Sequence, residues 1–96
     1  MRPSEVLEQN RQYIREAVAR RRTTNPRLFG SVLHGTDTEG SDIDILVDTL
    51  PGATLFDLGG LQEELNERLG VPVQIVTPEE LHRFFKDKVL AEARPI

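Results

Sequence analysis

Two aspartates, Asp42 and Asp44, stand one residue apart inside an otherwise apolar segment, DIDILVD at residues 42–48. Aspartate is a poor strand former, and carboxylates held close together repel each other, so packing alone gives little reason for this pair. The period of two in the segment places both residues on one face of a strand, about 7 Å apart along the backbone. Flexible carboxylates at that spacing can converge on one divalent cation, and Mg²⁺ prefers such hard oxygen ligands.

A candidate phosphate-binding turn precedes the aspartates. Gly30 and Ser31 are followed by ten residues and then by Asp42. Glycine lets a backbone approach a phosphate closely, and the N–H groups of the turn and the Ser31 hydroxyl can donate to phosphate oxygens. Each motif alone is common in proteins without such a site, because Gly-Ser is usually a turn and Asp-x-Asp usually caps a strand or faces solvent. Their conjunction is much more specific.

The stretches FGSVLHG and SDIDILV, both within residues 28–48, resemble the signature of nucleotidyltransferases similar to DNA polymerase beta, and in particular the minimal nucleotidyltransferase family. The resemblance implies an Mg²⁺-dependent transfer of a nucleoside monophosphate, most often AMP from ATP, to an acceptor hydroxyl with release of pyrophosphate. It assigns Asp42 and Asp44 to catalysis and metal binding, and Gly30 and Ser31 to the terminal phosphates. It also implies a partner, because such proteins are often encoded beside a HEPN-domain ribonuclease toxin. Adding AMP to a tyrosine of that toxin would make the chain an antitoxin.

Two residues depart from the family pattern. Many relatives carry Arg where this chain has His34, and a neutral imidazole offers one donor in place of a guanidinium fork. A nucleotide-binding histidine and a plain surface histidine are equally open at this position. Gln74, in the run VQIV, stands where relatives commonly supply a third carboxylate. An amide is a poorer Mg²⁺ ligand and cannot act as a general base, so this departure indicates slow turnover or a substitute group.

The acids available as substitutes are Asp37, Asp48 and Glu79. Asp48 shares the strand face of Asp42, but six strand rises, roughly 20 Å, separate the two residues. We therefore expect Asp48 to be structural. A metal-bound arrangement can still activate an acceptor hydroxyl without a dedicated base.

The elements expected to position these residues follow the order α-β-β-α-β-α. This order predicts an α/β (α+β) fold in which helices pack on a small mixed sheet. The expected strands span residues 27–33, 42–48 and 71–77. The expected helices begin at the N-caps Ser4, Thr54 and Thr77, and the middle helix ends at Gly70.

The length of 96 residues, with 38% hydrophobic content, suits one domain over residues 1–96. No apolar run is long enough to span a membrane and no apolar signal core begins the sequence, while the lack of cysteine fits a cytoplasmic location. The net charge of −4 disfavours broad attraction to nucleic acid. The basic run at residues 20–22 is interpreted mainly as solvated charge at the end of a helix.

The last helix carries adjacent aromatic residues, Phe84 and Phe85, which point about 100° apart. Core packing by both is the favoured interpretation, and contact of one with a partner is the alternative; His82 is expected to be solvated. The small size favours a macromolecular acceptor and leaves homo- or hetero-oligomers open. Three functions remain: an active transferase, an inactive relative that neutralises its partner by binding, and a noncatalytic sensing domain that no feature positively supports.

Overall fold

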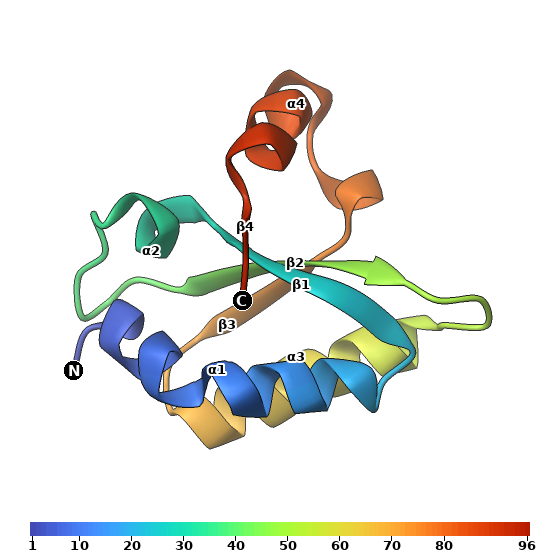
Figure 1. Cartoon of the computed structure of the whole chain (residues 1–96), viewed down its shortest axis with the longest axis horizontal. Coiled ribbons are helices and arrows are strands. Elements are labelled where there is room, and N and C mark those ends of the chain that lie inside the picture. Colours follow the sequence, from blue (N-terminus) through green and yellow to red (C-terminus); the bar gives the residue numbers. More distant parts are fainter.

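The computed structural model describes residues 1–96, whose four strands form one sheet in the order β3-β2-β1-β4 (Figure 1). The strands are β1 (Thr23–Phe29), β2 (Ile43–Thr49), β3 (Val73–Val76) and β4 (Arg94–Pro95). The helices are α1 (Pro3–Ala19), α2 (Gly30–His34), α3 (Leu55–Leu69) and α4 (Arg83–Glu92), with a 3₁₀ turn η1 (Pro78–Glu80). β1 is antiparallel to β2 and β4, whereas β2 and β3 are parallel. The expected α/β architecture with a small mixed sheet is confirmed.

The two faces of β2 differ in character. Ile43, Ile45 and Val47 are fully buried in the core that α1 and α3 form with the sheet. Because side chains alternate along a strand, Asp44 points to the opposite face. On that side of the sheet α4 stands away from α1 and α3 (Figure 1). Burial of Ile43 and Ile45 on either side of Asp44 therefore fixes its direction, although Leu46, farther along the face of Asp44, is also fully buried.

Helix α3 follows its sequence signals and also covers the outer edge of the sheet. Thr54 caps its N-terminus in a reciprocal arrangement with Asp57, and Gly70 ends it in the left-handed conformation at φ +71°. The side chains of Asn66 and Gln62 accept hydrogen bonds from the Val73 and Ile75 amides at 2.6 and 2.9 Å. The free edge of β3 is therefore satisfied within the chain.

The start of α1 differs from the prediction. Ser4 is not the N-cap, because the helix begins at Pro3 with Arg2 before it. Proline suits the first helical position since it has no N–H to satisfy there. The Ser4 amide instead donates to a carboxylate oxygen of Asp37 at 3.0 Å. A loop residue distant in sequence thus takes the role that the sequence assigned to Ser4.

The first strand also differs, because it begins at Thr23 and ends at Phe29. Its pairing with β2 shifts between Thr24 and Arg27, and Asn25 there has a positive φ of 55°. This bulge accommodates Pro26, which cannot donate to the sheet. Residues 30–34, which the sequence placed partly in the strand, form the short helix α2.

The last predicted helix is interrupted. Thr77 and Glu80 form the expected capping contacts, but the turn they begin ends at Glu80. A second start follows at His82, whose Nδ1 accepts a hydrogen bond from the Phe84 amide at 3.2 Å, and α4 runs from there. The core-packing prediction for the two phenylalanines is wrong, because Phe84 and Phe85 are 75% and 62% exposed.

The basic run at residues 20–22 binds acceptors of the same chain. Arg20 and Arg21 each pair with Glu64 of α3, at 3.0 and 3.1 Å, and Arg22 donates to the Gly52 carbonyl. These contacts join the end of α1 to α3 and the loop before it. No helix of the structure is both long and apolar enough to cross a bilayer.

Candidate functional site

Asp42 and Asp44 lie where the chain enters β2, and both are half-buried. Ile43 between them is fully buried against the helices, so the strand period directs Asp44 to the open face. Asp44 is paired with Phe29 on β1 and with Gln74 on β3. It therefore occupies the middle of three adjacent strands.

Gly30 follows Phe29 directly and lies against Asp44. Its φ is +76°, a conformation that residues with side chains rarely adopt. A Cβ placed on Gly30 would collide with the Asp44 carboxylate. Glycine at this position therefore makes room for the aspartate.

The electrostatics of the pair favour a cation. Burial raises the pKa of Asp44, and the negative charge of Asp42 raises it further. A divalent cation between the carboxylates would offset both effects. Two carboxylates on an open sheet face therefore fit Mg²⁺, and the structure contains no cluster of three His, Cys, Asp or Glu residues that could bind a metal alone. Mg²⁺ commonly has few protein ligands and completes its shell with water and phosphate oxygens.

Gln74 is the register partner of Asp44 in the parallel pairing of β2 and β3. Register partners share a sheet face, so the exposed Gln74 side chain stands next to Asp44. The chain thus places a neutral amide beside Asp44, and the role predicted for this position stays a prediction.

Ser31 follows Gly30 in α2 and is half-buried. Its carbonyl accepts a hydrogen bond from the Thr36 amide at 3.0 Å, whereas its hydroxyl has no hydrogen-bond partner within the chain. The hydroxyl is therefore free to donate to a ligand, and its contact with a phosphate stays a prediction.

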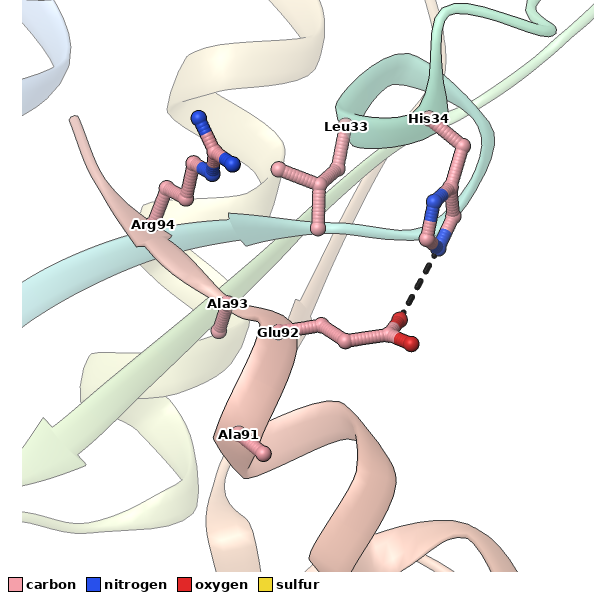
Figure 2. Close-up of a pocket in the computed structure, with 6 residues that line it drawn as sticks. All are labelled: Leu33, His34, Ala91, Glu92, Ala93 and Arg94. Atoms are coloured by element: carbon pink, nitrogen blue, oxygen red, sulfur yellow. Dashed lines mark ion pairs between the residues drawn. The ribbon is translucent and has the colours of Figure 1, made fainter.

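His34 ends α2 and lies at a separate opening, between α2 and the end of α4 (Figure 2). Its Nε2 is 3.0 Å from a carboxylate oxygen of Glu92, and its side chain is 51% exposed. The opening has a volume of about 480 Å³, and its lining also includes Leu33 and Arg94. The Glu92 contact was not predictable from spacing, because the two residues are distant in sequence and belong to different elements.

The other acids are held away from the pair or are exposed. Asp48, farther along β2, accepts hydrogen bonds from Arg27 and Asn25 at 3.2 and 3.0 Å, which agrees with the structural role expected for it. The Asp37 side chain is fully buried and pairs with Arg2. Glu79 is exposed on η1. None of the three lies beside Asp44 in the sheet pairing.

Comparison with known proteins gives one consistent family. A family model described as "Nucleotidyltransferase domain" matches residues 11–96. "Putative protein adenylyltransferase MJ0435" of Methanocaldococcus jannaschii is 44% identical over 66 residues, which are 69% of this chain and 71% of that protein. The family match includes the segments that carry the glycine turn and the paired aspartates.

Solved structures agree with the fold. A structure described as "Structure of putative minimal nucleotidyltransferase" has a TM-score of 0.86 at 38% identity, covering 97% of this chain and 95% of that chain. A toxin-antitoxin crystal structure with AMP-PNP has a TM-score of 0.75 at 23% identity, covering 90% of this chain and 71% of that one. At that identity the second likeness shows the fold alone.

Proposed function

Because the chain belongs to the nucleotidyltransferase domain family, we propose that it transfers AMP from ATP to a hydroxyl group of a partner protein. The observation that carries the proposal is the placement of Asp44 against the Gly30 backbone, with Asp42 close enough to raise its pKa. This arrangement joins a carboxylate pair for a cation to a turn that a phosphate can approach.

The residues have distinct roles in the proposed reaction. Asp42 and Asp44 would hold Mg²⁺, which supplies charge neutralisation at the α-phosphorus and at the leaving pyrophosphate. The turn at Gly30 and the Ser31 hydroxyl would donate to the terminal phosphates. The acceptor oxygen forms a bond to the α-phosphorus, the bond from that phosphorus to its bridging oxygen breaks, and pyrophosphate leaves. Gln74 cannot take the proton of the acceptor hydroxyl, and we propose that this proton passes to solvent water.

The acceptor is proposed to come from another protein. The single tyrosine of the chain, Tyr13, donates its hydroxyl to Glu64 at 2.6 Å on the helix-covered side of the sheet. The toxin-antitoxin likeness supports a toxin as the partner, and we propose a HEPN-domain toxin. The chain would then be its antitoxin.

Helix α4 offers a surface for this partner. Phe84 and Phe85 project from a helix that has no buried residue. Three basic side chains, Arg83, Lys86 and Lys88, and one acid, Asp87, flank them in a chain whose net charge is −4, and Lys88 also lies 4.0 Å from Glu92. Exposed aromatic rings with a basic rim fit an apolar patch with acidic surroundings on the acceptor protein.

A second function is favoured by Gln74. With an amide in register with Asp44, the chain would bind nucleotide weakly or turn over slowly and would neutralise its partner by occupying it. In this alternative the chain still binds its partner protein, but AMP transfer is not needed for neutralisation.

The direct test incubates the protein with Mg²⁺, ATP labelled at the α-phosphate and the HEPN-domain protein. We expect label on the partner, lost in Asp42→Asn and Asp44→Asn. The matched control is Asp48→Asn, which changes an aspartate of the same strand that is bound by Arg27. Transfer that persists in both site variants would contradict the assignment, as would calorimetry showing that their Mg·ATP affinity is unchanged.

A further inference from the structure

We propose that Arg2 and Asp37 form a clamp that positions Asp42 for metal binding, an inference that rests on the proposed function. The clamp acts on residues 35–42, which connect α2 to β2 and are called here the site loop. Gly30 and Ser31 lie at the start of α2, before this loop, and Asp42 lies at its far end. The conformation of the site loop therefore sets where Asp42 stands relative to the glycine turn.

The Asp37 carboxylate is the buried centre of the clamp. Its side chain is fully buried, with Oδ1 accepting from Arg2 Nη2 at 3.1 Å and Oδ2 accepting from the Ser4 amide at 3.0 Å. The hydrogen bond from the Ser4 amide and the charge of Arg2 lower the pKa of Asp37. Both oxygens are thus occupied by donors from the beginning of α1, so an asparagine could satisfy only one of them.

The Arg2 guanidinium also holds the backbone of the site loop. Its Nε donates to the Asp37 carbonyl at 3.2 Å, and its Nη2 lies 3.5 Å from the Gly35 carbonyl. The second half of the loop closes on itself, because the Ser41 amide donates to the Thr38 carbonyl and the Thr38 amide donates to the Ser41 hydroxyl. The loop is therefore fixed both by α1 and by its own turn.

Asp42 needs this support more than Asp44 does. Asp44 is held by strand pairing on both sides, whereas Asp42 precedes β2 and has no partner in either pairing. The like charge of Asp44 repels it. A loop fixed in advance keeps Asp42 beside Asp44 before the cation arrives, which reduces the cost of binding.

One side of the clamp comes from a part of the chain outside the family match. Arg2 and Ser4 precede residue 11, where the match begins, whereas Asp37 lies within it. Neither they nor Asp37 touches the proposed metal position, so they are positioning residues. Loss of a partner that orients a metal ligand typically weakens metal affinity by about 10–100-fold.

The test measures Mg²⁺-dependent binding of a non-hydrolysable ATP analogue by calorimetry in Arg2→Gln, Asp37→Asn and the double variant. We expect affinity to fall by about 10–100-fold in each single variant and little further in the double variant, because both changes break one unit. Arg2→Lys should restore part of the affinity, since it keeps the charge. Arg11→Gln is the matched control, because Arg11 lies on α1, the helix that Arg2 precedes, and pairs only with Glu8.

Thermal unfolding of the same proteins separates positioning from stability. Arg2→Gln leaves Asp37 bonded to the Ser4 amide, so it gives a folded protein for the comparison if Asp37→Asn does not fold. A lower Tm with wild-type affinity would overturn the clamp and leave the proposed function standing. Failure of the wild-type protein to bind the Mg²⁺ complex would overturn the proposed metal site, and the clamp with it.

Discussion

The ionised form of Asp44 lowers the stability of the folded protein. Burial and the neighbouring Asp42 raise its pKa, so the folded protein holds a proton on Asp44 more tightly than the unfolded chain does. The resulting contribution to stability is fully present below the unfolded pKa of about 3.9 and is lost as the pH rises through the folded pKa. Without metal, the ionised aspartate therefore destabilises the protein at neutral pH.

Asp44→Asn should accordingly raise the Tm of the metal-free protein at pH 7, and the gain should vanish near pH 3. In a domain of this size about 1 kcal/mol shifts the Tm by roughly 4–8 °C, so a gain of a fraction of that size is measurable by calorimetry. Adding Mg²⁺ with ATP should stabilise the wild type and not the variant. A variant less stable than wild type at pH 7 would show that Asp44 is held by favourable contacts.

Gly30→Ala should disrupt the site by contact with Asp44. Gly70→Ala is the control, because Gly70 at the end of α3 has nearly the same positive φ, 71° against 76°, but no atom lies within 4 Å of its Cβ position. Both variants should lose about 1–3 kcal/mol from backbone strain. Only Gly30→Ala should also lose Mg·ATP binding, as measured by calorimetry. Equal affinities in the two variants would contradict the close approach of Asp44 to Gly30.

Gln74→Asp should place a third carboxylate beside the paired aspartates. The register pairing places the new carboxylate beside Asp44. There it can serve as a metal ligand and can take the proton of the acceptor hydroxyl. General-base assistance is typically worth ~10²–10⁴-fold, so the rate of labelled AMP transfer should rise. Without metal the third charge should lower the Tm. An unchanged rate would mean that the site already has a base or that residue 74 faces away during transfer.

Elements with a strong local signal were predictable from the sequence, and elements decided by distant contacts were not. The alternation of Ile43, Ile45 and Val47 predicted the faces of β2, and Thr54 and Gly70 predicted the ends of α3. These features depend on strand period and backbone capping, which are local. The same logic placed Gln74 on the face of Asp44.

The start of α1 depends on atoms outside its own segment. The break before α4 depends on two competing helix caps. Ser4 was a sound cap by composition, but the Asp37 carboxylate supplies the acceptor from the site loop. Thr77 was predicted to cap the last helix, but it caps only the short turn η1, and the His82 ring caps a second start from which α4 runs. The pairing of His34 with Glu92 has no sequence signature. The local sequence pattern does not indicate which residues of distant segments will contact each other.

The whole molecule separates a covered side from an exposed one. α1 and α3 bury one face of the sheet, whereas α4 projects on the other side and contributes no buried residue (Figure 1). Asp44 faces this second side. An acceptor protein that docks on α4 would therefore meet the same side of the sheet as the paired aspartates.

The double variant Asp42→Ala, Asp44→Ala distinguishes two ways in which the chain could protect cells: by transferring AMP to the toxin, or by covering the toxin's surface. Neither residue contributes to the main hydrophobic core, so the variant should fold and still co-purify with the HEPN-domain protein. If protection requires AMP transfer, cells producing the toxin and this variant should stop growing. If the chain protects by occlusion, the variant should protect fully.

The docking helix is tested in the same growth assay by Phe84→Glu, which should abolish co-purification and protection because it places an unpaired charge in the interface. Phe56→Glu is its control, because Phe56 is a phenylalanine that is 90% exposed on α3, away from α4. The exposed position of Phe84 means that the Tm of either variant should stay close to that of the wild type. Wild-type binding by Phe84→Glu would place the interface elsewhere. Loss of binding in both variants would point to a partner that also covers α3, since one helix would then not be sufficient to hold it.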